Sequence, residues 1–228
     1  MWYIYLLIGM YLYMPFFSGW LDKAKRSTKQ VYLGIWFVSL FLPYVSAYVS
    51  HFLYGEATWN QFGMFYYFSG FAGYLLLGHY LKEGNDWSLS KTLAICLALF
   101  AFGYVITYWG FSAAAANPAS TEPEMELFFT FCSPNVALMT IAMFLLLQKV
   151  RVHNPTVIKL LANVTKYGFG IYIVHYFMVG PVFIFIRQFD LPIPLQVPVM
   201  ATLIFLLSWG FTWGMYRLLG QKAKWLMG

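Results

Sequence analysis

Long apolar stretches alternate with short polar segments along the whole sequence. Seven of these stretches are long enough to cross a membrane, because about 20 apolar residues in a helix span a hydrocarbon layer of ~30 Å. They are Met1–Trp20, Val31–Val49, Phe62–Leu81, Ser90–Gly110, Leu127–Leu147, Gly168–Arg187 and Leu195–Leu219. A transmembrane β-barrel would instead show ~10-residue segments of alternating hydrophobicity. The pattern therefore predicts an all-α integral membrane protein, with one transmembrane domain over residues 1–228 formed by a bundle of about seven helices.

Composition and charge agree with this interpretation and add an orientation. Hydrophobic residues make up 61% of the chain and charged residues 10%, which is typical of a membrane protein. All of the 14 Lys and Arg residues except Arg187 fall on one side of the predicted spans. The positive-inside rule makes this side cytoplasmic, so the N-terminus is predicted outside and the C-terminus in the cytoplasm. The net charge of +6 then reflects topology, and no nucleic-acid partner is expected.

Two connecting segments have patterns of their own. Asn154–Lys166 carries apolar residues at helical spacing, which predicts a short amphipathic helix on the cytoplasmic face. Phe111–Glu126 contains a run of alanines and two prolines, which predicts a mobile external loop.

One histidine lies well inside a predicted span. Counting from Gly168, His175 is about 10 Å deep in the hydrocarbon layer. Tyr172 precedes it by one turn, and Pro181 follows, where a missing hydrogen bond to the Phe177 carbonyl favours a kink. An imidazole at this depth is expected to face the bundle. It can act as a base or hydrogen-bond donor, or it can be a structural group bonded to a neighbouring helix.

A second polar group interrupts the fifth predicted span. Pro134 frees backbone carbonyls there, so Ser133 and Asn135 can line a wet cavity. The alternative is a kink with local hydrogen bonds, in which Asn135 bonds across helices. The Asp and Glu residues all lie in loops or at span edges, which argues against a carboxylate relay for ion transport. We find no cluster of metal ligands in the sequence and expect no metal.

Three runs of the sequence together resemble one family. They are Trp2–Leu12 closed by Pro15, Ser133–Pro134 leading into Phe144–Leu146, and Gly168–His175, Gly-Phe-Gly-Ile-Tyr-Ile-Val-His. In order and spacing they resemble stretches of the bacterial transmembrane acyltransferase-3 family, whose later run reads F-G-I-Y-L-x-H. The resemblance covers essentially the whole chain.

The resemblance implies a function and a location. Members of this family have about ten spans and transfer acyl groups, commonly acetyl from acetyl-CoA, to hydroxyls of surface polysaccharides or other envelope glycans. It therefore implies acetyl-CoA or another acyl-CoA as donor, a glycan acceptor, and a multi-pass protein among the lipids of the bacterial inner membrane. The family's Arg and His in its first span have no counterpart here. We therefore expect a truncated member, resembling the C-terminal two-thirds of the domain, whose catalytic His would lie upstream of Met1.

The candidate site follows from what the chain contains. His175 is the best catalytic candidate, and the candidates for a substrate pocket are Tyr172, Asn135, Ser133, Trp2 and Tyr5. We expect residues 1–228 alone to be inactive unless an N-terminal fragment supplies the missing helices. The competing class is a non-catalytic membrane protein, such as a glycan or lipid translocation subunit or a scaffold. A translocator predicts polar groups at several depths, and an enzyme predicts a cytoplasmic cavity for CoA bordered by Lys and Arg.

Overall fold

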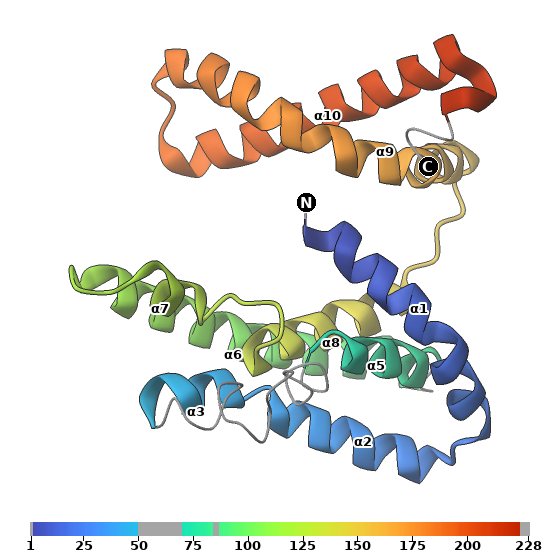
Figure 1. Cartoon of the computed structure of the whole chain (residues 1–228), viewed down its shortest axis with the longest axis vertical. Coiled ribbons are helices and arrows are strands. Elements are labelled where there is room, and N and C mark those ends of the chain that lie inside the picture. The colour runs from blue at the N-terminus through green and yellow to red at the C-terminus, as the bar shows by residue number, and fades with distance from the viewer. Residues whose placement is uncertain (1, 50–69, 84–86, 224–228) are drawn as a thin grey trace. The chain divides into compact units, whose positions relative to one another are not determined.

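The computed structural model describes residues 2–49, 70–83 and 87–223. It divides the chain into two compact units. One, here the N-terminal unit, is Ile8–Val150, and the other, the C-terminal unit, is Arg151–Gly228 with Met1–Leu7. All regular elements of the described residues are helices (Figure 1). They are α1 (Trp2–Lys23), α2 (Arg26–Ser39), α3 (Leu42–Tyr48), α5 (Ala72–Lys82), α6 (Leu89–Ala116), α7 (Glu122–Glu126), α8 (Pro134–Lys149), α9 (Pro155–Ile186), η3 (Arg187–Phe189), α10 (Ile193–Leu219) and η4 (Gly220–Lys222).

Four of the predicted spans are confirmed as helices long and apolar enough to cross a membrane. They are Ile4–Lys23, Leu89–Ala116, Pro155–Phe189 and Ile193–Leu219. Each has an uninterrupted apolar run, so local sequence is enough to specify it. The described residues thus form an all-helical membrane protein.

The second and fifth predicted spans are not single helices. The segment predicted as Val31–Val49 is divided between α2 and α3, because Pro43 near the start of α3 cannot donate a hydrogen bond to the carbonyl of Ser39. In the fifth, Pro134 is the first residue of α8 and not a kink within a longer helix. Proline is favoured at this position, where its missing N–H has no partner to lose.

Three further differences concern the other connecting segments and the third predicted span. The predicted loop Phe111–Glu126 is helical at both ends, since α6 continues to Ala116 and α7 covers Glu122–Glu126. Alanine has the highest helix propensity, which explains the extension of α6 through the alanine run. The amphipathic segment Asn154–Lys166 is helical from Pro155 but continues without a break into α9. Of the third predicted span, Phe62–Leu81, only α5 and the turn before it lie within the described residues.

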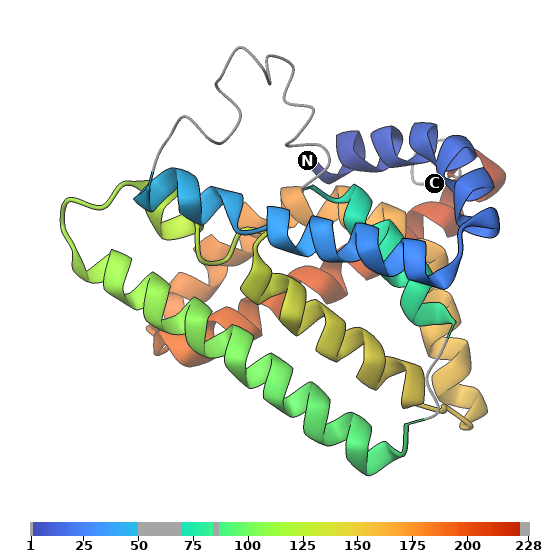
Figure 2. The same ribbon diagram turned by 90° about the horizontal axis from the view of Figure 1, so that it is seen from below.

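Close approach of α6 and α8 organises the N-terminal unit, and Figure 2 shows these two helices side by side. A Cβ added at Gly103 would lie 2.5 Å from the carbonyl oxygen of Asn135, so only glycine permits this separation. Trp36 of α2 belongs to the hydrophobic core of this unit. Its side chain is 2% exposed and packs with Leu40, Leu77 and Ala137. Its indole Nε1 donates to the Gly70 carbonyl oxygen at 3.0 Å.

The C-terminal unit is built on the pairing of α9 with α10. Trp209 Nε1 donates to Asn163 Oδ1 at 3.0 Å, and the Tyr167 and Tyr216 rings meet edge to face at 4.9 Å. The helix α9 begins with Asn154, whose side chain accepts hydrogen bonds from the backbone of the first turn. Its 32 residues extend about 48 Å, which exceeds the hydrocarbon thickness of a bilayer.

Candidate functional site

His175 lies in α9 at the margin of its buried face. Val174 is buried and Tyr176 is 62% exposed, and His175 between them is half-buried. Its Nδ1 is hydrogen-bonded to the carbonyl oxygen of Tyr172, and the two rings are 5.2 Å apart. A carbonyl only accepts, so this hydrogen bond requires the proton on Nδ1, and an imidazole of that tautomer has its lone pair on Nε2. His175 is therefore chemically able to accept a proton at Nε2.

Asn135 lies at the centre of a hydrogen-bond network in the N-terminal unit. Its side chain is fully buried, and both donors and the acceptor oxygen have partners. The amide nitrogen donates to Thr107 Oγ1 at 2.8 Å and to the Phe128 carbonyl at 2.7 Å. Its oxygen accepts from the Tyr44 hydroxyl at 2.9 Å. Asn135 thus links α8 to α6, to α3 and to the segment before α8, which is the cross-helix bonding considered from the sequence.

The remaining predicted site residues occupy separate places. Ser133 is buried beside Asn135 and donates to the Thr130 carbonyl at 2.8 Å. Tyr5 is 77% exposed on α1. Trp2 begins α1, and its side chain lies outside the described residues. The structure therefore brings the predicted residues together in two pairs, Tyr172 with His175 and Ser133 with Asn135, and each pair belongs to a different unit.

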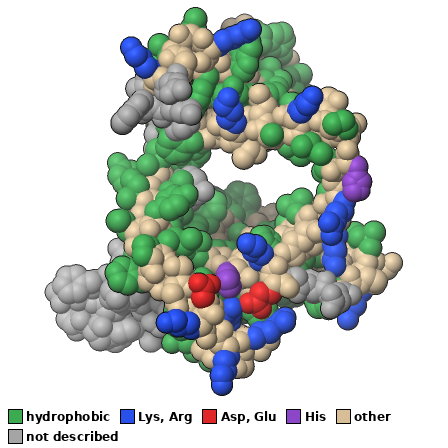
Figure 3. All heavy atoms as spheres, turned by 90° about the vertical axis from the view of Figure 1, so that its right-hand side faces the viewer, with side chains coloured by type: hydrophobic (Ala, Val, Ile, Leu, Met, Phe, Trp, Pro, Cys, Tyr) green, Lys and Arg blue, Asp and Glu red, His purple; other side chains and the backbone are tan. Residues whose placement is uncertain are grey.

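A charged cluster between α2 and α5 was not predicted as a site. Lys29 is 6% exposed, and its Nζ donates to Glu83 Oε1 at 2.8 Å and lies 3.2 Å from His79 Nε2. The hydrogen bond from Lys29 is the main reason that the pKa of the Glu83 carboxyl is below its ordinary value. In Figure 3, acidic, histidine and basic side chains gather on the lower part of the face shown. This cluster fastens α2 to α5 at the end of both helices that is predicted to be cytoplasmic.

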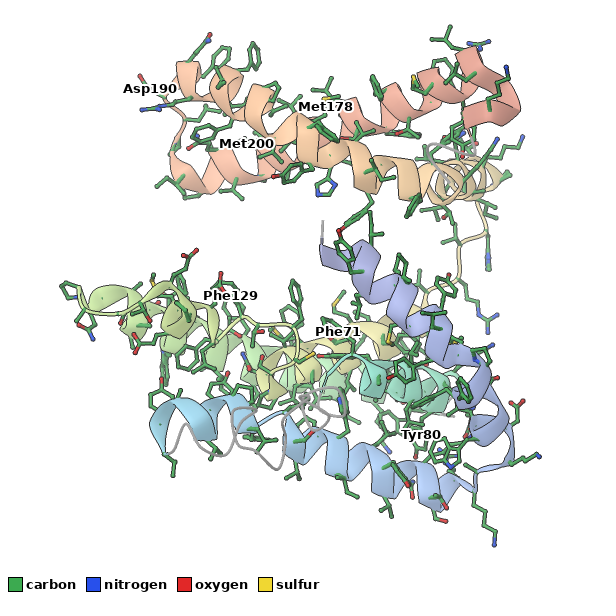
Figure 4. All side chains as sticks on the ribbon, viewed as in Figure 1. Phe71, Tyr80, Phe129, Met178, Asp190 and Met200 are labelled. Carbon is green, nitrogen blue, oxygen red and sulfur yellow. The ribbon has the colours of Figure 1, made fainter. Side chains whose placement is uncertain are left out.

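A second contact of α2 with α5 lies next to this cluster. The Tyr80 hydroxyl, labelled in Figure 4, accepts from Gln30 at 2.8 Å and from Arg26 at 3.4 Å. The Arg26 guanidinium also lies 5.1 Å from the centre of the Tyr80 ring. The signal for both contacts was present in the spacing, since Arg26, Lys29 and Gln30 share one helical face. Those basic residues were used only to assign the orientation of the spans.

The described part of the chain holds no group of three or more His, Cys, Asp or Glu side chains that could bind a metal ion.

One known protein family matches most of the chain. A family model described as an acyltransferase domain, that of the acyltransferase-3 family, matches residues 1–213. Neither the curated proteins nor the solved structures contain a match. The match spans most of the sequence and includes all three runs that carry the resemblance, as well as α9 with His175. The chain belongs to the acyltransferase-3 family of membrane proteins.

Proposed function

We propose that the protein takes part in transferring an acyl group, most commonly acetyl, from an acyl-CoA to a hydroxyl of an envelope glycan. The observation that carries this proposal is the family match over residues 1–213. The apolar helices α1, α6, α9 and α10 support it, because they suit a catalyst that works in the membrane between a soluble donor and an envelope acceptor.

The chemistry defines what the protein must supply. The acceptor oxygen attacks the thioester carbonyl, the C–S bond breaks, and the hydroxyl proton passes to a base and then to the leaving CoA thiolate. The reaction needs that base and hydrogen-bond donors for the developing oxyanion, in a site with little water. We propose that His175 is the base. Its Nε2 would accept the proton of the acceptor hydroxyl, while its Nδ1 is hydrogen-bonded to the Tyr172 carbonyl.

In the proposed topology, the acyl donor and the glycan acceptor reach the protein from opposite sides of the membrane. The protein lies in the bacterial inner membrane as a multi-pass protein, with its N-terminus outside and its C-terminus in the cytoplasm. Acyl-CoA then arrives from the cytoplasm and the glycan from outside.

Transfer can be tested in membrane vesicles from cells that carry the gene at its natural position and from a deletion strain. The vesicles receive acetyl-CoA labelled in the acetyl group. We expect label in the glycan fraction that mild alkali releases as acetate, and only in vesicles that contain the protein. Equal ester labelling in both strains would refute the proposed function.

The same vesicles test the role of His175. We expect His175→Gln to lower transfer by about 10²-fold or more, because general-base catalysis contributes roughly 10²–10⁴-fold. Tyr176→Phe is the matched control, since Tyr176 is the exposed neighbour on the same helix and should tolerate the change. Transfer by His175→Gln at the rate of the unchanged protein would assign His175 a structural role.

A further inference from the structure

A cavity of about 310 Å³ lies in the N-terminal unit between the ends of α3 and α6 and the segment of α7. Its volume is at the lower end of the ~300–1,000 Å³ typical of small-ligand sites, which suits a single sugar residue. Its walls combine small apolar and aromatic residues with four polar ones. The lining residues are Ala47, Tyr48, Gly110, Ala113, Ala114, Asn117, Ser120, Glu124, Leu127 and Phe128.

Contacts within the N-terminal unit fix the position of Phe128, one of the two aromatic residues that line the cavity. A Cβ added at Gly110 would lie 2.1 Å from the Phe128 ring, so the ring rests directly on the backbone of α6. The centre of the Phe128 ring lies 5.6 Å from the centre of the Tyr44 ring. The backbone carbonyl of Phe128 accepts a hydrogen bond from the Asn135 side chain. Phe128 is therefore fixed by contacts on two sides, and Tyr48 supplies a second aromatic ring. Aromatic rings of this kind pack against the C–H face of a sugar.

The polar rim is also ordered by bonds within the chain. Asn117 Oδ1 accepts from the Ala119 backbone at 3.1 Å, and Glu124 Oε2 accepts from the Thr121 backbone at 2.8 Å. The Asn117 amide nitrogen, the second Glu124 oxygen and the hydroxyls of Ser120 and Tyr48 are the further hydrogen-bonding groups of the lining. This mixture of donors and acceptors matches sugar hydroxyls, each of which both donates and accepts.

Charge restricts which sugars the cavity can accept. Among the described residues, the lining contains one carboxylate, that of Glu124, and no Lys or Arg. Glu122 and Glu126 lie on the same short helix and are exposed. At ~4 Å in water, two like charges repel enough to lower affinity about fivefold. An anionic sugar, such as a uronic acid, is therefore disfavoured, whereas a neutral sugar is not.

We infer that this cavity binds one neutral sugar residue of the acceptor glycan and discriminates against anionic sugars. The role of acceptor site rests on the proposed function, and the proposed topology places this end of α6 outside, where envelope glycans lie. The cavity can hold and select the sugar, with its apolar face on Phe128 and Tyr48 and its hydroxyls toward Asn117, Ser120 and Glu124.

Direct binding tests the inference without requiring transfer. The purified full chain is placed in a detergent that has no sugar headgroup, and saturation-transfer NMR measures binding of cellotetraose and of tetragalacturonate. We expect the neutral probe to bind at least about fivefold more tightly than the anionic one. Equal or tighter binding of the anionic probe, or no binding of the neutral one, would overturn the inference.

Two variants locate the binding in the cavity. Glu124→Gln keeps the capping geometry, since glutamine also fills that position, and should bring the two affinities close together. Glu122→Gln is the matched control on the same helix and should retain most of the preference, because Glu122 does not line the cavity. Gly110→Ala should displace Phe128 and weaken cellotetraose binding about tenfold or more. Unchanged binding in both cavity variants would place the sugar elsewhere.

Because Gly110→Ala can disturb folding, Tyr48→Leu provides an independent test. Tyr48 is 69% exposed, so its replacement should leave the melting temperature unchanged and still weaken binding severalfold. Cellotetraose bound by this variant as tightly as by the unchanged chain would contradict the inference. Sugar binding without acyl transfer in vesicles would refute only the proposed function, whereas transfer without selective sugar binding would refute only the cavity assignment.

Discussion

Replacement of Asn135 by leucine tests how the N-terminal unit is held together. Leucine has a similar shape but removes all three hydrogen bonds, to Tyr44, Thr107 and the Phe128 carbonyl. Thr107 keeps a bond to the Gly103 carbonyl at 3.0 Å, and the Tyr44 hydroxyl keeps the side chain of Ser133 as a hydrogen-bond partner, so the Phe128 carbonyl is the group that loses its partner. Interhelical hydrogen bonds in membrane proteins contribute about 0.6 kcal/mol each on average. Three such bonds give an expected loss of about 2 kcal/mol in the free energy of unfolding.

The measurement is unfolding in mixed micelles with increasing sodium dodecyl sulfate, followed by tryptophan fluorescence. A double-mutant cycle with Tyr44→Phe isolates the bond from the Tyr44 hydroxyl to Asn135. We expect a coupling energy of about 0.6 kcal/mol, with an upper bound near ~1.7 kcal/mol. Tyr44→Phe should therefore cost much less in the Asn135→Leu background than in the unchanged protein.

Thr202→Val on α10 is the matched control. Thr202 is exposed, and its hydroxyl donates to the carbonyl oxygen of Pro198, in its own helix, at 2.8 Å. We expect its loss to change stability by less than about 0.5 kcal/mol. A cost for Asn135→Leu no larger than this control, or additive effects in the cycle, would refute the network as a cross-helix link.

Two further predictions concern α5 and its contact with α2. Gly73→Ala should lower the free energy of unfolding by about 1–3 kcal/mol through overpacking, because the added Cβ would lie 2.1 Å from Trp36 Nε1. The control is Gly78→Ala, whose added Cβ meets nothing within 4 Å and should leave stability unchanged in the same unfolding measurement. The pKa of Glu83 is lowered from 4.5, so its contribution to stability is complete above about that pH and is lost as the pH falls through the lower folded value. The melting temperature should drop below pH 4.5 in the unchanged chain and less in Glu83→Gln, and identical pH profiles would contradict the role of the Lys29–Glu83 pair.

The long helices were predictable because their signal is local. Apolar length alone defines α1, α6, α9 and α10, and each was predicted as a span. The predictions of Val31–Val49 and Leu127–Leu147 as single helices were wrong for a reason that is visible in the sequence. Pro43 and Pro134 remove backbone donors, but a hydropathy pattern averages over single residues, so two helix starts were absorbed into predicted spans.

The site was predictable only in part, because its contacts join distant parts of the chain. The sequence indicated that Asn135 would bond across helices, but its partner Tyr44 lies 91 positions away. Lys29 was counted as a cytoplasmic charge, and its burial against Glu83, 54 positions away, depends on how α2 packs on α5. The hydrogen bond from His175 to the Tyr172 carbonyl is different, since three residues separate the two along one helix. Only contacts of this local kind follow directly from spacing.

Esterification of glycan hydroxyls by this protein, as we propose it, can be measured in cells as the O-acyl ester content of envelope glycans, determined by NMR. The comparison uses three strains: one with the gene, one with the gene deleted, and one with the deletion complemented. We predict that deletion removes an ester signal, that the glycan backbone stays unchanged, and that complementation restores the ester. Ester signals of equal intensity in all three strains, with the gene expressed, would contradict the claim.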